Sequence, residues 1–436
     1  MGAPLDLTPM LPGLERVAGR LLEGVEVPRV TWVRQRLDPP VLEDIEAHVR
    51  SEVGAALERT GRAPQRVAVG AGSRGVANYG RIVTTVVETL REAGWDPFVV
   101  PAMGSHGAAS AEGQTQVLAD HGIDRELVRA TMETEVVGVA LGVPVHVDRN
   151  VAEAGAVFLV NRIKPHTSFR GAVESGLAKM AAVGLGKQPG ARTMHAEGVN
   201  GLRDRIPVAA RLLRERGLLV GGLGIIENQR DETARVAGLA ADEVGEAAEA
   251  ALLEEARRLM PAIPFGDLDV LVIERMGKDI SGAGMDTNVL GRMRVIGQPE
   301  PQPYSVTAVV VLDLTDASHG NAMGIGSADY TTARLVSKID FEALYTNGIT
   351  AGLIGIERMK LPVIMPNDLS AVLAAIAARG RSTPIRLALI RDTLHVAELR
   401  VSEALVEEAR GRDDLEVVGG REPMPFDASG RLRPLG

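Results

Sequence analysis

Short apolar runs alternate with helix-like repeats along the first half of the chain. Runs at 66–69, 97–100 and 156–160 have the length of buried strands. After the first run, apolar residues recur at helical spacing, at Ile82, Val83, Val86, Val87 and Leu90. Strands that alternate with helices are typical of parallel βαβ units, whose ligands bind beyond the carboxyl ends of the strands.

The pattern changes near residue 260. Residues 235–260 are rich in Ala, Glu and Leu and predict a long helix, which ends in a segment with two prolines, 260–264. Strand patterns restart after this segment, at 268–274, 305–314 and 387–390. We therefore predict an α/β protein of two domains, each a mostly parallel sheet flanked by helices. The N-terminal domain is expected over 1–265 and the C-terminal domain over 266–436, with the active site in the cleft between them.

Composition narrows the function classes. The formal net charge of −9 argues against a large nucleic-acid footprint. The chain has no Cys, which excludes disulfides, iron–sulfur clusters, thiolate zinc sites and cysteine nucleophiles. No apolar run approaches the roughly 20 residues that span a bilayer, and the first residues lack the pattern of a signal peptide. We expect a cytoplasmic protein without a membrane or nucleic-acid partner.

A glycine-rich turn follows the first predicted strand, with the spacing Gly70-x-Gly72-x-x-Gly75. Backbone amides ahead of a helix can hold a phosphate, and the guanidinium of Arg74 within the turn can bind a phosphate or carboxylate. The dinucleotide motif also has an acid at the end of the second strand, whereas that strand here ends in 99–102, Val-Val-Pro-Ala. The turn predicts an anion site, and an NAD-type dehydrogenase remains an alternative.

Two histidines follow predicted strands. His106 lies between Gly104 and Gly107, and His166 follows Pro165. A single histidine is more often structural than catalytic. Because these two occupy equivalent positions at strand ends, they favour an acid/base pair.

The segment from 162 to 195 is strongly basic. Its only acid is Glu174, and its basic residues are Arg162, Lys164, His166, Arg170, Lys179, Lys187, Arg192 and His195. We interpret this segment as an anion-binding wall. Lys179 lies among small apolar residues, where lost hydration can lower the pKa of an amine and make it a nucleophile or covalent anchor. A helix lysine that extends to solvent is the alternative, and His195 is a candidate metal ligand.

The second half offers weaker signals. Lys278 begins a glycine-rich polar turn after a predicted strand. Residues 313–329 hold several Asp and Asn side chains, which could bind a hard cation but are explained more simply by turn formation.

The constellation resembles the nickel-dependent lactate racemases, within the wider group of 2-hydroxyacid racemases and epimerases. The resemblance rests on His106 in Gly-Ser-His-Gly, His166 in Lys-Pro-His, Lys179 after Gly-Ala-Val-Glu-Ser-Gly, and His195 beyond that lysine. Enzymes of this family carry a nickel-pincer nucleotide, a pyridinium mononucleotide with thioamide and thiocarboxylate groups. The cofactor is tethered to a lysine, and one histidine completes the ligands of its nickel.

The resemblance implies roles for particular residues. Lys179 would be the tether, His195 the nickel ligand, and His106 with His166 the paired acid/base residues. It places the cofactor in the N-terminal domain and assigns part of the substrate site to the C-terminal one.

The remaining expected site residues lie in glycine-rich turns. Arg74 would contact cofactor and substrate, in a turn that reads Ala-Gly-Ser-Arg-Gly where the family has Asp-x-Thr-Arg-Pro. Gly72 in that turn and Gly184 after the tether would approach the cofactor. Lys278 is the candidate partner for the substrate carboxylate.

The expected function is therefore racemisation or epimerisation of a lactate-like 2-hydroxyacid, by transient hydride transfer to the nickel-pincer nucleotide. The alternatives are the NAD-type dehydrogenase and a non-catalytic relative that binds a nucleotide or metal. Expected partners are a small hydroxyacid and the enzymes that make the cofactor, and a homo-oligomer is left open.

Overall fold

The computed structural model describes residues 5–435 except 74, 197, 302–304 and 380–383. The chain divides into two compact units. The central unit is Pro39–Met260, and the terminal unit combines Met1–Asp38 with Pro261–Gly436. Both are mixed α/β structures with mostly parallel sheets, which confirms the expected fold class.

The central unit is built on a sheet with strand order β3-β2-β6-β7-β8. All neighbours are parallel except β8, which runs antiparallel to β7. The strands are β2 (Arg66–Ala71), β3 (Asp96–Pro101), β6 (Val157–Arg162), β7 (Leu219–Glu227) and β8 (Thr233–Ala240). A separate antiparallel pair is formed by β4 (Thr134–Ala140) and β5 (Val143–Asp148). Three of the expected strands are thus β2, β3 and β6.

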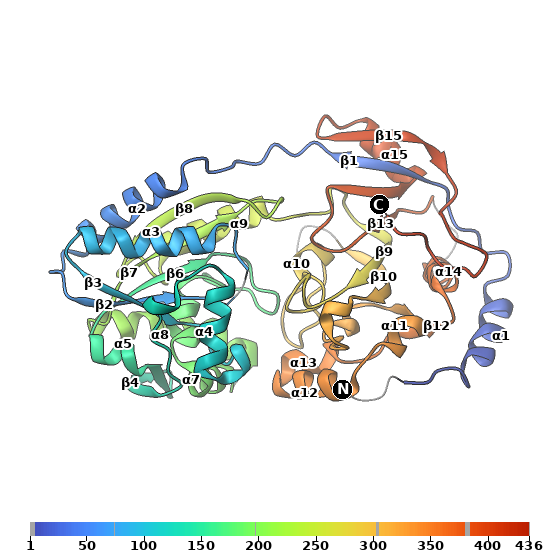
Figure 1. Cartoon of the computed structure of the whole chain (residues 1–436). Coiled ribbons are helices and arrows are strands. Elements are labelled where there is room, and N and C mark those ends of the chain that lie inside the picture. Colours follow the sequence, from blue (N-terminus) through green and yellow to red (C-terminus); the bar gives the residue numbers. More distant parts are fainter. Residues whose placement is uncertain (1–4, 74, 197, 302–304, 380–383, 436) are drawn as a thin grey trace. The chain divides into compact units, whose positions relative to one another are not determined.

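Helices cover both faces of this sheet (Figure 1). Apolar residues of α2 (Ile45–Thr60) and α3 (Tyr79–Glu92) share one core with the sheet. The other face has glycines where helices approach closely: a Cβ on Gly222 would lie 2.9 Å from Leu177 Cδ1. The remaining helices are α4 (Ala111–Asp120), α5 (Arg149–Ala154), α6 (Leu177–Lys179), α7 (Lys187–His195), α8 (Gly198–Glu215) and α9 (Ala247–Leu259).

The expected helix over 235–260 is wrong in its first part. Residues Thr233–Ala240 form β8, and the helix α9 begins at Ala247. The apolar residues of β8 contact α2 on one side, and its backbone pairs with β7. Sheet pairing at this edge overrides the helix preference of the Ala-rich composition.

The terminal unit has a sheet with strand order β12-β11-β10-β9-β13-β14-β1-β15. Its strands are parallel from β12 to β13 and antiparallel from there to β15. The strands are β1 (Val30–Gln35), β9 (Leu268–Met276), β10 (Val306–Leu314), β11 (Tyr330–Thr332), β12 (Val363–Met365), β13 (Leu387–Ile390), β14 (Glu398–Ser402) and β15 (Leu415–Glu422). The helices are α1 (Leu11–Leu21), α10 (Thr287–Leu290), α11 (Ala333–Ser337), α12 (Phe341–Thr350), α13 (Leu353–Arg358), α14 (Asp368–Arg379) and α15 (Glu403–Arg410).

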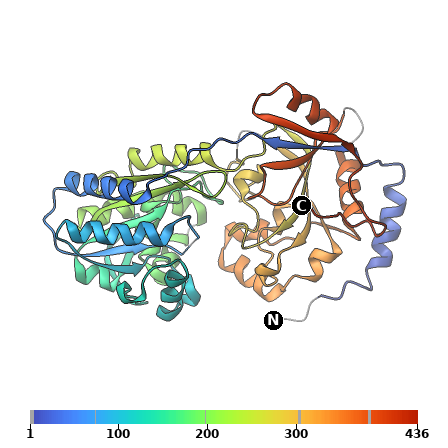
Figure 2. The same cartoon turned by 45° about the horizontal axis from the view of Figure 1, so that its top comes forward.

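The N-terminal segment does not follow the expected division at residue 265. Strand β1 lies between β14 and β15 and pairs antiparallel with both, so the first 38 residues belong to the terminal unit. Figures 1 and 2 show this blue strand among the red strands of the chain's last segment. Among the described residues, no helix is both long and apolar enough to cross a membrane.

Glu274, near the end of β9, is expected to make the stability of the terminal unit depend on pH. Burial raises its pKa to about 7, although Leu435 N donates to its carboxylate at 2.6 Å. The folded carboxyl binds more protons than the unfolded one between its ordinary pKa of 4.5 and 7, so stability falls as pH rises through this window. We expect Glu274→Gln, which retains the acceptor oxygen, to remove this loss.

With an allowance for solvent screening, the effect is about 1 kcal/mol at pH 8. The Tm of the variant relative to that of the wild type should therefore rise by about 2–4 °C from pH 5 to pH 8. Equal pH dependence of the two proteins would contradict a raised pKa at Glu274.

Candidate active site

The carboxyl edge of the central sheet brings together loops from neighbouring strands. Ser73 follows β2 and His106 follows β3, and Ser73 Oγ lies 2.5 Å from His106 Nδ1. His121, just after α4, holds the same turn, because its Nε2 lies 3.1 Å from the carbonyl oxygen of Ser73 and must donate to it. The imidazole of His106 is thus oriented by a hydroxyl, which can accept or donate a hydrogen bond.

His166 lies beyond the end of β6 and is oriented by its own loop. The backbone N–H of Ser168 donates to His166 Nδ1 at 3.0 Å, and Glu174 accepts the backbone N–H of His166 at 2.6 Å. The ring packs against Phe169, with centroids 4.5 Å apart. Because Nδ1 accepts, the neutral ring carries its hydrogen on Nε2.

Hydrogen bonds with Asn161 and Glu249 fix the backbone of the segment that carries Lys179. Asn161 at the end of β6 donates to the carbonyl of Gly176 at 2.8 Å. The buried carboxylate of Glu249 accepts the backbone N–H of Ala178 at 3.1 Å, at the start of α6. Burial raises the pKa of Glu249, and backbone N–H groups of Gly245, Ala178 and Leu177 oppose that shift. Lys179 itself ends α6, is partly exposed, and leads into one turn of π-helix over Met180–Gly184.

His195 is the last residue of α7. Its Nδ1 lies 2.6 Å from the carbonyl oxygen of Ala191, so Nδ1–H donates and Nε2 keeps its lone pair. Desolvation lowers the pKa of His195, and the positive charge of Lys179 lowers it further. The charge of Lys179 on α6 thus acts on the imidazole of His195 on α7. A histidine whose second nitrogen is fixed by a backbone carbonyl is typical of metal ligands.

Gly72 and Gly184 are explained by packing within the chain. The backbone N–H of Gly72 donates to Tyr79 Oη at 2.6 Å, and burial raises the pKa of this tyrosine. A Cβ on Gly184 would lie 2.5 Å from the carbonyl oxygen of Ala102. The amide of Ala77, ahead of α3, donates to Glu227 at 2.6 Å. Two amides that a phosphate would need in this turn are therefore already used, which weakens the case for a dinucleotide site.

The structure does not test the roles expected of two site residues, Arg74 and Lys278. Arg74 lies outside the described residues. Lys278 belongs to the terminal unit, where its Nζ donates to the carbonyl oxygen of Gly282 at 2.8 Å. The ammonium of Lys278 is thus engaged by its own turn.

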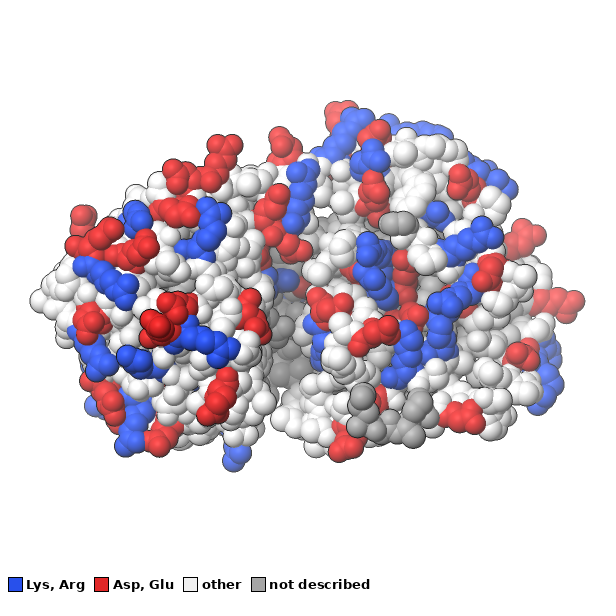
Figure 3. Space-filling view, viewed as in Figure 1, with Lys and Arg blue, Asp and Glu red and all other residues white. Residues whose placement is uncertain are grey.

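The anion-binding wall expected over 162–195 is wrong for several of its members. Arg162 pairs with Glu227, and Lys187 is fully buried with its Nζ 2.8 Å from Asp148 Oδ2. Arg170 donates to the carbonyl oxygen of His166 at 2.7 Å. The counter-charges come from segments remote in sequence, so the local excess of basic residues overstated the free positive charge. On the face in Figure 3, basic and acidic side chains are interspersed.

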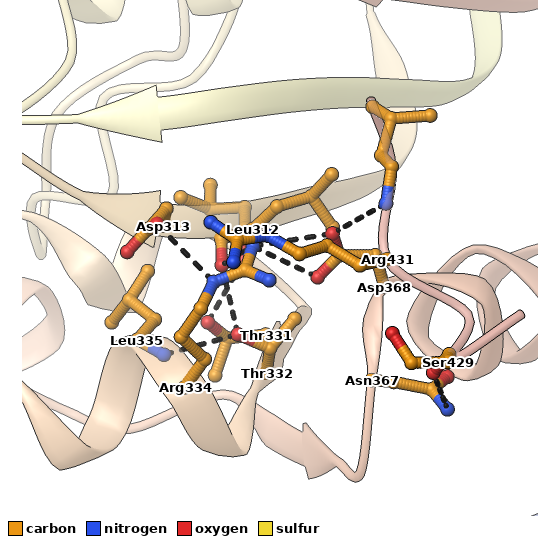
Figure 4. A network of polar contacts seen from close by, with 12 residues as sticks. Leu312, Asp313, Thr331, Thr332, Arg334, Leu335, Asn367, Asp368, Ser429 and Arg431 are labelled. Atoms are coloured by element: carbon orange, nitrogen blue, oxygen red, sulfur yellow. Dashed lines mark hydrogen bonds and ion pairs between the residues drawn. The ribbon is translucent and has the colours of Figure 1, made fainter. Parts of the chain in front are cut away.

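The acidic stretch over 313–329 is neutralised by basic side chains. Arg334 lies 3.2 Å from Asp313 and 3.0 Å from Asp368 (Figure 4). Lys338 lies 2.8 Å from Asp313. Asp329 is paired with Arg292 at 2.6 Å. In the part of the chain that the structure describes, no three or more His, Asp or Glu side chains are grouped to hold a metal ion.

Sequence reasoning missed Ser73, Asp148 and Gln114. Ser73 had a usable signal, since it adjoins Arg74 in a turn at a strand end. Asp148 and Gln114 had none, because each acts through contacts with Lys187 that the folded chain alone creates.

Comparisons with known proteins add little. No family model matches the chain, and a search of curated proteins found no match. Among solved structures, the chain is similar to the lactate racemase apoprotein from Thermoanaerobacterium thermosaccharolyticum. The two are 11% identical, the similarity covers 89% of this chain and 96% of that one, and the TM-score is 0.46. A similarity of this size supports no statement about activity.

Proposed function

We propose that the protein racemises or epimerises a lactate-like 2-hydroxyacid, with a nickel-pincer nucleotide attached to Lys179. One observation carries the proposal. Lys179 ends a helix whose first turn is fixed by Glu249, and its charge acts on His195. The Nδ1–H of His195 donates to Ala191, which leaves the lone pair of Nε2 for a metal. The expected partners are the hydroxyacid and the enzymes that make the cofactor.

Lys179 and His195 fit a nickel-pincer nucleotide in their chemistry. The chain has no Cys, so sulfur ligands would have to come with the cofactor, and one imidazole is what the protein would add. His195 can supply that imidazole, since its Nδ1–H donates to Ala191 and leaves the lone pair of Nε2 for a metal. Lys179, partly exposed at the end of a helix fixed by Glu249, can supply the tether.

Lys179 and His195 would hold the pincer nucleotide, which when bound would supply a reversible hydride acceptor for C2 of the hydroxyacid. The chain's own histidines would handle the proton of the substrate hydroxyl. His106 can take this proton at Nε2 while Nδ1–H donates to Ser73 Oγ. His166, whose Nδ1 accepts from Ser168, presents Nε2–H and can donate a hydrogen bond to the substrate oxygen. With these tautomers, one imidazole can accept a proton and the other can donate a hydrogen bond.

Co-expression with the enzymes that make the cofactor tests this proposal. We expect the intact mass to rise by one cofactor, the added mass to map to Lys179, and nickel to be near stoichiometric. The loaded protein should then interconvert the enantiomers of at least one short 2-hydroxyacid. Unmodified mass without nickel, while an authentic lactate racemase loads in parallel, would overturn the proposal.

Replacing His195 by Ala separates metal binding from attachment. The variant should keep the added mass on Lys179 but bind nickel more than about 100-fold more weakly, since even second-shell losses cost 10–100-fold. Elemental analysis after dialysis measures the metal. His146→Ala is the control, because His146 lies on β5 with its Nδ1 3.2 Å from Thr134 Oγ1. Full nickel content in His195→Ala would show that another group binds the metal.

A further inference from the structure

Three polar side chains lie together in the interior of the central unit. Lys187, Asp148 and Gln114 each have an exposed fraction of 0%. The Lys187 ammonium lies 2.8 Å from Asp148 Oδ2 and 3.1 Å from Gln114 Oε1, and it also donates to the carbonyl oxygen of Pro101 at the end of β3. Two hydrogen bonds and the ion pair with Asp148 offset the cost of burying the charge.

Gln114 connects this buried charge to the loop that carries His106. Its Nε2 donates to the carbonyl oxygen of Gly104 at 2.9 Å and to that of His106 at 3.2 Å. The side-chain amide therefore accepts from Lys187 with its oxygen and fixes the loop backbone with its nitrogen. The loop also packs tightly on α4, since a Cβ on Gly107 would lie 2.7 Å from the backbone nitrogen of Gln114.

The network of Lys187, Asp148 and Gln114 also contacts the segment that carries Lys179 and His195, the proposed tether and metal ligand. Lys187 begins α7, the helix that ends at His195. It follows the π-helical turn, and Gly184 in that turn accepts the backbone N–H of Gly104 at 3.0 Å. The buried charge thus lies where the His106 loop meets the helix of His195.

The backbone of Lys187 supports a specific role for its side chain. Its φ is +51°, in the left-handed region that favours glycine. A strained backbone and a buried charge at one residue are both unfavourable, and such features persist where the surrounding structure holds them in place, often at functional sites.

We infer that Lys187, Asp148 and Gln114 are positioning residues that set the His106 loop against the helix of His195. This inference rests on the proposed function for the role of His106. The placement of the loop by Gln114 is independent of it. Without the network, the loop would keep its fold but lose the fixed position of its imidazole.

Two substitutions of Gln114 test the inference. Gln114→Glu keeps an acceptor for Lys187 but places carboxylate oxygens against the two loop carbonyls, and Gln114→Leu removes every polar contact. Thr115→Ala is the matched control on the same helix, because Thr115 Oγ1 donates within α4 to the carbonyl oxygen of Ala111 at 2.9 Å. Hydrogen exchange of peptides over 101–110 should quicken about tenfold or more in both Gln114 variants and remain unchanged in the control.

In the cofactor-loaded protein, both Gln114 variants should lower kcat by about tenfold or more with KM nearly unchanged, because misplacement by about 1 Å is costly. Unchanged exchange over 101–110, or exchange that quickens equally throughout the central unit, would overturn the inference. If the wild type catalyses no racemisation while exchange still depends on Gln114, the inference about the loop stands and the proposed function fails.

Discussion

Replacing His106 by Ala is expected to lower kcat/KM for racemisation by about 100- to 10,000-fold, the usual contribution of a positioned acid/base group. The imidazole lies beyond the end of β3 with its Nδ1 2.5 Å from Ser73 Oγ, and the proposal assigns proton transfer to its Nε2. Interconversion of the two enantiomers, followed by chiral chromatography on cofactor-loaded protein, measures the effect.

The control for this variant is His48→Ala. His48 is exposed on α2, and its Nδ1 lies 2.7 Å from the carbonyl oxygen of Asp44. Both variants should carry the added mass and nickel, so that a loss specific to His106 reports on proton transfer. Activity of His106→Ala within about threefold of the wild type would remove this residue from the mechanism.

Short apolar runs in the sequence were sufficient to predict most of the parallel strands of the central unit's sheet. Strands β2, β3 and β6 are short apolar runs, and their burial on both faces makes that pattern visible in the sequence. The position of β1 could not be predicted in this way. Its pairing partners, β14 and β15, lie more than 360 residues away, and nothing in residues 30–35 identifies them.

The same contrast applies to the candidate site. His106 and His166 were found because a strand end is a local feature, and the structure places both at the carboxyl edge of the sheet. The charge pattern over 162–195 misled because Glu227 and Asp148 lie outside that segment and pair with Arg162 and Lys187. A surplus of one charge in the sequence gives an electrostatic surface only after its remote partners are known.

Changing Lys179 to Arg should abolish attachment of the cofactor. A thioamide bond requires an amine that can lose its proton, and a guanidinium stays charged at every pH the protein tolerates. Arg preserves the positive charge near His195, so the variant tests the bond and leaves the local charge in place. After co-expression, mass spectrometry should find no added mass on Lys179→Arg, and racemisation should be absent.

The control for attachment is Lys360→Arg, at a lysine whose Nζ pairs with Glu357 at 2.6 Å in the terminal unit. It should load like the wild type. Added mass on Lys179→Arg would place the tether at another lysine, and Lys187 is the least suited of these, because its ammonium is buried with three acceptors around it. Partial exposure distinguishes Lys179 from the fully buried Lys187 as a nucleophile.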